Sequence, residues 1–178
     1  MTYKRAEDIS EDLGLDKTEI KEMNSILDEY PMQITEYYHS LINFDDPDDP
    51  IKKMSIPSIY EFDSDGSFDT SGEGDNTVLP GMQHKYLQTA MILSTNQCAM
   101  YCRHCFRRRL VGLDTDEVVD HLDEIVEYIK EHKEISNVLV SGGDSFMNSN
   151  TVLEKYLAKL TDIPHLDFIR FGTRMLVV

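Results

Sequence analysis

The sequence lacks any run of apolar residues that could cross a membrane, for which about 20 consecutive apolar residues are needed. Residues 1–15 alternate charged residues with single apolar ones, so the apolar stretch of a secretion signal is also missing. These absences argue against a membrane protein and make the cytoplasm the expected compartment. Apolar residues still form 40% of the 178 residues, which is enough for one globular domain with a core.

Basic residues are scarce. The chain has 17 Lys and Arg against 33 Asp and Glu, a formal net charge of −16, and residues 1–81 hold 20 of the acids but only 6 of the bases. Nucleic-acid binding requires clustered Lys and Arg, so we expect no nucleic-acid partner. The one basic exception is the run of three arginines at residues 107–109.

Cysteines are also few, and all three lie within residues 98–105. An odd number of cysteines without a secretion signal indicates a metal site rather than disulfides. Thiols at positions 1, 5 and 8 of a short loop can surround a [4Fe–4S] cluster and leave one iron without a protein ligand. Zinc is the alternative, with His104 as a fourth ligand, although His104 directly precedes Cys105 and joint tetrahedral binding is awkward. The spacing favours iron–sulfur and leaves zinc open.

The first 81 residues predict an acidic region of helices and extended chain. Apolar spacing predicts one helix over about residues 10–29 and a short one over residues 35–41. Residues 45–50 hold four carboxylates and two prolines, but they lack the glycine and the terminal glutamate of an EF-hand calcium loop. Residues 63–80 are rich in Gly, Ser, Asp and Thr and predict an extended loop.

The remaining residues alternate strand and helix patterns. This alternation predicts parallel strands joined by crossovers, either in an open doubly wound sheet or at the start of a β/α barrel. The expected strands cover residues 90–93, 137–140 and 168–178, and the expected helices begin at Asp114 or Thr115 and at Asn150 and end near Ile129 and Pro164.

A second polar motif, Ser141-Gly142-Gly143-Asp144, follows the second expected strand, just as the cysteine loop follows the first. In both architectures ligands bind at the carboxyl ends of the strands, so we expect the two motifs at the same rim. Glycines let a backbone approach a ligand closely, and a carboxylate suits an ammonium group. Taken alone, such a turn is usually only a connection.

Together these motifs resemble the radical SAM superfamily and, within it, the lysine 2,3-aminomutase family. The matching strings are Cys-Ala-Met-Tyr-Cys-Arg-His-Cys-Phe-Arg-Arg-Arg at 98–109, Tyr-Pro-Met-Gln-Ile-Thr-Glu-Tyr-Tyr at 30–38, Asp-Pro-Asp-Asp-Pro-Ile at 46–51 and Val-Ser-Gly-Gly-Asp at 140–144. The resemblance runs from about residue 30 to residue 178. It implies an α/β fold in which an N-terminal helical region, residues 1–81, precedes the first β/α units of a partial radical SAM barrel, residues 82–178.

The resemblance implies that Cys98, Cys102 and Cys105 bind three irons of a [4Fe–4S] cluster, while the amino and carboxylate groups of S-adenosylmethionine (SAM) chelate the fourth iron. An electron from a donor such as ferredoxin or flavodoxin would cleave SAM to methionine and a 5′-deoxyadenosyl radical, which abstracts hydrogen from the substrate. The cofactors carry this chemistry, and the protein positions and shields them.

Further roles are implied at the rim. Ser141, Gly142, Gly143 and Asp144 match the strand-end motif that contacts the methionyl amino group of SAM. Arg107 falls where the family holds the carboxylate of a small-molecule amino-acid substrate, a task that suits a planar guanidinium. The alternative for Arg107 is a surface charge or an ionic partner for the acidic first half of the chain.

The sequence departs from the family where arginines hold the phosphate of pyridoxal 5′-phosphate. Residues 84–89 read His-Lys-Tyr-Leu-Gln-Thr, so Lys85 lacks the bidentate fork and Thr89 lacks the charge. Phe106 stands where the lysine enzyme has threonine. These departures weigh against pyridoxal phosphate as a cofactor. They leave open a member without it, and also a relative that modifies a lysine of a translation factor, which residues 105–108 also resemble.

The chain is too short to contain a whole β/α barrel. Such a barrel takes about 200 residues or more, and the first strand is expected only near residue 90. We therefore expect an N-terminal piece of a longer enzyme that is inactive alone. The non-catalytic alternative is an iron–sulfur or zinc protein that senses redox state or binds a partner. Association of identical chains is left open.

Overall fold

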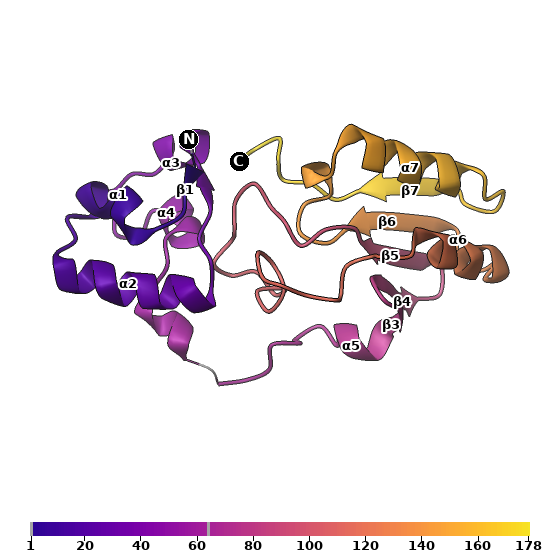
Figure 1. The fold of residues 1–178 in the computed structure, drawn as a ribbon, viewed down its shortest axis with the longest axis horizontal. Helices are drawn as coiled ribbons and strands as arrows, with labels where there is room; N and C mark the ends of the chain where they lie inside the picture. The colour runs from indigo at the N-terminus through magenta and orange to yellow at the C-terminus, as the bar shows by residue number, and fades with distance from the viewer. Residues whose placement is uncertain (1, 64) are drawn as a thin grey trace.

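The computed structural model, which describes residues 2–63 and 65–178, places a helical N-terminal region beside a five-stranded sheet (Figure 1). Apolar side chains of the N-terminal region, among them Ile9, Leu27 and Ile34, form a second core that also contains Met100. The elements of this region are β1 (Thr2–Tyr3), α1 (Ala6–Leu13), α2 (Lys17–Glu29), β2 (Ile34–Thr35), α3 (Glu36–Ser40), α4 (Pro50–Ser55) and the 3₁₀ helix η1 (Ile59–Phe62).

The prediction of a single helix over residues 10–29 is wrong, because two helices, α1 and α2, occupy this stretch. Gly14 ends α1 in the left-handed conformation, with φ at 65°, which glycine adopts without steric cost. Asp16 begins α2: its carboxylate accepts hydrogen bonds from the backbone N–H groups of Thr18 and Glu19, and the Glu19 side chain accepts from Asp16 N. This capping box fixes a second helix start that apolar spacing alone does not reveal.

The segment that follows has more regular structure than expected. The predicted short helix is confirmed as α3, with Thr35 as its N-cap. Asp49, in the carboxylate-rich stretch, caps α4 by accepting a hydrogen bond of 2.6 Å from Lys52 N. The expectation of a loop throughout residues 63–80 is wrong at its end, where α5 (Glu73–Asn76) and β3 (Thr77–Leu79) form. β3 is stabilised by pairing with the next strand, a contact that local composition cannot predict.

The sheet has the strand order β3-β4-β5-β6-β7. Strands β3, β4 and β5 pair antiparallel, whereas β5, β6 and β7 pair parallel as predicted. The third parallel strand is shorter than expected, because β7 ends at Phe171. The remaining elements are β4 (Met82–Tyr86), β5 (Thr89–Leu93), α6 (Leu122–Glu131), β6 (Asn137–Ser141), the 3₁₀ helix η2 (Ser145–Met147), α7 (Asn150–Thr161) and β7 (Phe168–Phe171).

Helices α6 and α7 cover the same face of the sheet. Ala90 and Ile92 of β5 and Val138 and Val140 of β6 are fully buried in one cluster with side chains from both helices. A doubly wound sheet carries helices on both faces, whereas a β/α barrel carries them only on the outside. The described residues carry helices on one face only, as expected for the start of a barrel.

The helix expected to begin at Asp114 or Thr115 begins instead at Leu122. The backbone N–H of Val119 donates to Leu93 O at 2.9 Å, so this segment continues along the end of β5 before the helix starts. Thr115 caps only a local turn, by accepting from Glu117 N. The apolar spacing did not reveal this delay because Val119 packs against the same core as the helix.

The two regions meet in several places. The C-terminal segment returns to the N-terminal region (Figure 1), where Val178 packs against its core. The sequence predicts a boundary between two regions at residues 81 and 82. β3 lies before this boundary but pairs within the sheet, and the boundary itself stays a prediction. None of the helices in the described part of the chain is both long and apolar enough to cross a membrane.

The helix starts generate a test. Asp16→Ala removes a side chain that accepts two backbone N–H bonds, so we expect a loss of about 1 kcal/mol in the free energy of unfolding. Asn150→Ala is the matched control, because Ser149 rather than Asn150 caps α7, and we expect a change within about 0.5 kcal/mol. Urea unfolding followed by circular dichroism measures both, and equal losses would contradict these caps.

Candidate functional site

The three cysteines lie in the long segment between β5 and α6 and line one cavity of about 240 Å³. The four residues of the 141–144 turn and Arg107 line the same cavity, as do residues 172–174 after β7. The structure therefore brings together every site residue that the sequence predicted. The carboxyl ends of three neighbouring parallel strands supply the walls, which is where β/α proteins bind ligands.

The cysteine segment and the 141–144 turn are joined backbone to backbone. Ser94 N donates to Ser141 O, Gly143 N donates to Thr95 O, and Asp144 N donates to Gln97 O. A Cβ atom added to Gly142 would overlap Thr95 O, and one added to Gly143 would overlap Gln97 O. The glycines therefore permit two protein segments to pack closely, in addition to any approach to a ligand.

Asp144 is 4% exposed, and its carboxylate binds the backbone of its own rim. One oxygen accepts from Phe146 N at 2.9 Å, and the other accepts from Arg174 N at 2.6 Å and from Met175 N at 3.1 Å. An ionised carboxylate has about four acceptor positions. Asp144 thus fixes the segment after β7 and retains acceptor capacity toward the cavity.

The cysteine thiols are half-buried and form no disulfide. Burial raises the pKa of Cys98 to about 12, and the neighbouring Cys105 and Asp144 add to the shift. Burial also raises the pKa of Cys102, opposed by the guanidinium of Arg174. Such thiols stay protonated on their own and become thiolates when a metal displaces the proton.

The donor set of the cavity fits a multi-iron cluster. Three thiols line it, and thiolates are the ligands that iron–sulfur clusters use. His104, the alternative fourth ligand of a zinc site, is exposed and does not line the cavity. Among residues 2–63 and 65–178, no three His, Cys, Asp or Glu side chains converge as ligands of a single metal ion.

The N-terminal region holds the outer side of the cysteine loop. The side chain of Gln33 donates to Cys98 O at 2.6 Å, and Gln33 O accepts from Tyr101 N at 2.9 Å. Arg103 N donates to Met54 O at 2.8 Å. These bonds come from backbone groups and an amide, so composition and spacing gave no signal for them.

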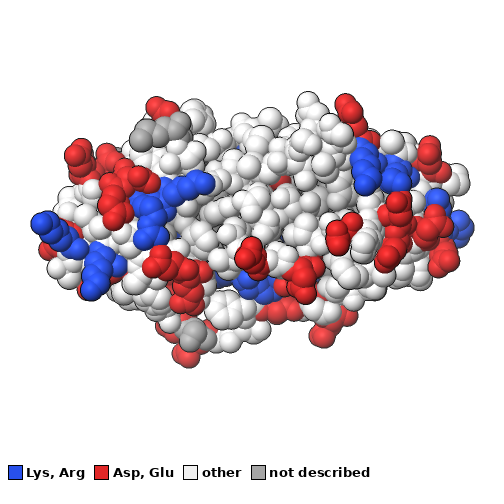
Figure 2. All heavy atoms as spheres, in the orientation of Figure 1, with Lys and Arg blue, Asp and Glu red and all other residues white. Residues whose placement is uncertain are grey.

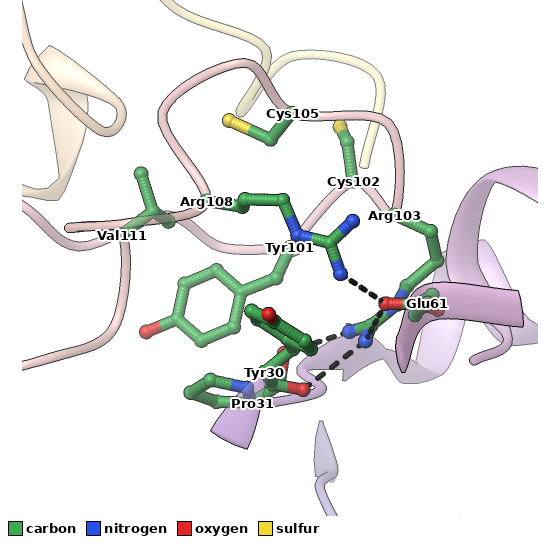
Figure 3. Close-up of a pocket in the computed structure, with 9 residues that line it drawn as sticks. All are labelled: Tyr30, Pro31, Glu61, Tyr101, Cys102, Arg103, Cys105, Arg108 and Val111. Atoms are coloured by element: carbon green, nitrogen blue, oxygen red, sulfur yellow. Dashed lines mark hydrogen bonds and ion pairs between the residues drawn. The ribbon is translucent and has the colours of Figure 1, made fainter. Parts of the chain in front are cut away.

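Glu61, in η1, is the ionic anchor of the same loop. Its carboxylate accepts two hydrogen bonds from Arg103, at 3.0 and 2.6 Å, and one of 2.8 Å from Arg108. The side chains of Glu61 and Arg103 are only 10% and 7% exposed. Figure 3 shows both guanidinium groups converging on Glu61 beneath the loop that carries Cys102 and Cys105.

A second buried glutamate, Glu73 of α5, binds the other two arginines of the run. Arg107 donates to Glu73 through Nε at 2.8 Å, to Gly142 O at 3.1 Å and to the sulfur of Met91 at 3.0 Å. Arg109 donates to the same carboxylate at 3.0 Å. Arg107 therefore forms an ion pair with a glutamate of the acidic first half, which was the alternative to a substrate-binding role. It also lines the cavity, as the substrate-binding role requires.

The arginine run consequently forms no basic patch. On the face drawn in Figure 2, the Lys and Arg side chains lie among Asp and Glu side chains, and the middle of the molecule is largely uncharged. Glu61 and Glu73 are functional-site residues that sequence reasoning missed. Their carboxylates reach the arginines across 42 and 34 positions of the chain, and nothing in their local sequence marks them.

Comparisons with known proteins agree with this geometry. Residues 92–176 match the Radical SAM superfamily. The chain is 42% identical over 160 residues to a putative L-lysine 2,3-aminomutase of Aquifex aeolicus, covering 90% of this chain and 43% of that protein. It is 39% identical to an L-lysine 2,3-aminomutase of Acetoanaerobium sticklandii, covering 97% of this chain and 42% of that protein. It is also 39% identical to a glutamate 2,3-aminomutase of Clostridioides difficile, covering 95% and 40%. The chain thus spans about two fifths of the length of these curated relatives.

The anchoring of the cysteine loop can be tested through its carboxylates. Glu61→Gln leaves Arg103 and Arg108 without a buried counter-charge, so we expect a loss of about 3–5 kcal/mol in the free energy of unfolding. Glu117→Gln is the matched control, because Glu117 is 41% exposed and its partner Arg109 keeps Glu73.

We expect the control to lose less than about 1 kcal/mol. Urea denaturation of both variants beside the unaltered chain makes the comparison. A Glu61→Gln variant as stable as the control would show that this buried pair does not anchor the loop.

Proposed function

We propose that the chain is a radical SAM enzyme in which Cys98, Cys102 and Cys105 hold a [4Fe–4S] cluster, because residues 92–176 match the Radical SAM superfamily and most of the chain is similar to lysine 2,3-aminomutases. When bound, this cluster supplies the electron that cleaves SAM to methionine and a 5′-deoxyadenosyl radical. The observation that carries the proposal is the single cavity shared by the three thiols and the 141–144 turn.

We place the amino-acid end of SAM at the turn formed by Ser141, Gly142, Gly143 and Asp144. The turn faces the cysteines across the cavity, and Asp144 keeps acceptor capacity suited to an ammonium group. The backbone bonds from Gly143 and Asp144 to the segment before Cys98 support this placement, because they hold the turn in a fixed position relative to the thiols. The protein's contribution is thus to position the two sites relative to each other.

Arg107 is the proposed contact for the carboxylate of an amino-acid substrate. Arg107 lines the cavity and is only 6% exposed, so a carboxylate bound to its guanidinium would be shielded from water. Glu73 already accepts a hydrogen bond from the Nε of Arg107 and forms an ion pair with its Nη2. A substrate carboxylate would therefore share Arg107 with Glu73, which fixes the direction in which the guanidinium points.

The reaction we propose first is amino-group migration on an amino acid, because several relatives carry the names lysine and glutamate 2,3-aminomutase. Residues 84–89 do not fit the phosphate of pyridoxal phosphate. Lys85 is the one cation there, and it donates to Ser71 O, while Thr89 donates to Asn137. We assign no step to that cofactor. These residues favour, as a second candidate, a radical SAM reaction without pyridoxal phosphate, with a ferredoxin- or flavodoxin-type electron donor in both cases.

The proposal is tested by anaerobic reconstitution of the chain with iron and sulfide. We expect about four irons and four sulfides per chain. We also expect slow cleavage of SAM to 5′-deoxyadenosine by the reduced protein, since this step requires only the cluster and the SAM site, whereas turnover of an amino-acid substrate is not expected from this piece alone. Changing any one of Cys98, Cys102 or Cys105 to Ala removes a ligand and should abolish both signals. His104→Ala is the matched control and should keep the cluster, because His104 does not line the cavity.

Two results would refute this function. One zinc ion per chain in place of iron and sulfide would indicate a structural metal protein. A stable cluster that never cleaves SAM under reduction would indicate a redox sensor or an electron carrier. Loss of the cluster in His104→Ala would show that the ligand set is wrong.

A further inference from the structure

Arg174 donates a hydrogen bond to a cysteine sulfur. It lies just after β7, and its Nη1 donates to the Sγ of Cys102 at 2.6 Å. Its Nη2 donates to the sulfur of Met54 at 3.1 Å and to the hydroxyl of Tyr38 at 3.4 Å. The guanidinium therefore joins the C-terminal segment, the cysteine loop and the N-terminal region at one point.

The partners of Arg174 differ from those of the arginines in the run. Arg103 and Arg108 pair with Glu61, and Arg107 and Arg109 pair with Glu73. Within the described part of the chain, Arg174 forms no ion pair with a carboxylate, and its side chain contacts two sulfurs and a phenol oxygen. A partly buried cation without a counter-charge is unfavourable unless an anion lies nearby.

A cluster held by three thiolates would supply that anion. Hydrogen bonds and positive charge at the ligand sulfurs stabilise the reduced cluster and raise its reduction potential. We infer that Arg174 is a positioning residue that donates to Cys102 as a cluster ligand and makes the cluster easier to reduce. This inference rests on the proposed function, since it requires the cluster to form on the cysteine loop.

Asp144 acts through Arg174 in this arrangement. Its carboxylate accepts from the backbone N–H groups of Arg174 and Met175, so it fixes the turn from which the guanidinium reaches the sulfur. The buried carboxylate of the glycine-rich turn is thus coupled to the cysteine loop through the segment after β7. This coupling is separate from any contact that Asp144 makes with SAM.

The test is the reduction potential of the reconstituted chain in the absence of SAM, measured by anaerobic titration with electron paramagnetic resonance. Arg174→Gln should lower the potential relative to the unaltered chain, because a charged donor to the ligand sulfur is lost. Arg174→Lys keeps the charge but not the planar fork, and it should give a smaller shift. Arg170→Gln is the matched control: Arg170 is exposed in β7, bonds Asn137, and should leave the potential unchanged.

A double-mutant cycle tests the part of Asp144. If Asp144 works through Arg174, the shift caused by Arg174→Gln is smaller when Asp144→Asn is already present. Equal shifts in the two backgrounds would show that the two residues act independently.

The outcomes separate this inference from the proposed function. If the unaltered chain assembles no cluster, both the inference about Arg174 and the proposed function are refuted. If it assembles a cluster and Arg174→Gln has the same potential, the inference alone is overturned, and an effect seen only after SAM is added would assign Arg174 to SAM instead. Loss of the cluster from a folded Arg174→Gln variant, with Arg170→Gln intact, supports the positioning role.

Discussion

The structure depends on the pairing of two buried carboxylates with the arginines of the cysteine loop. Glu61 binds Arg103 and Arg108, and Glu73 binds Arg107 and Arg109. Breaking a buried pair by removing one partner is strongly destabilising, because the remaining charge has no solvent. These pairs therefore fix the loop against the N-terminal region and α5, and they supply counter-charges for the arginines at 107–109.

The loop is held from the other side by the sheet. The 141–144 turn packs backbone to backbone against the residues before Cys98, and Asp144 extends this support to Arg174 and Met175. The cysteines thus lie between two rigid supports that come from different parts of the chain. Such support suits a cluster ligand set, because ligand geometry and the groups around the sulfurs set the properties of an iron–sulfur site.

The sequence could predict those parts of the fold and site that local patterns encode. The strands at residues 90–93 and 137–140, the helix beginning near Asn150 and the meeting of both polar motifs at one rim follow from periodicity and from the rules of parallel sheets. The start of α6 and the formation of β3 could not be predicted, because each depends on hydrogen bonds to a strand distant in sequence or on a neighbouring strand. The break at Gly14 and Asp16 was visible as a glycine and a capping residue, but the apolar spacing across it concealed it. The roles of Glu61 and Glu73 depend on long-range ion pairs, for which a single sequence carries no signal.

The central claim is that the cysteine loop holds a cluster with one iron open to the cavity formed with the 141–144 turn. Mössbauer spectroscopy of the chain reconstituted with isotopically enriched iron, before and after SAM is added, tests it most directly. We expect one iron of the cluster to change its spectrum on addition of SAM while the other three do not. A spectrum in which all irons remain equivalent and unchanged by SAM would contradict it.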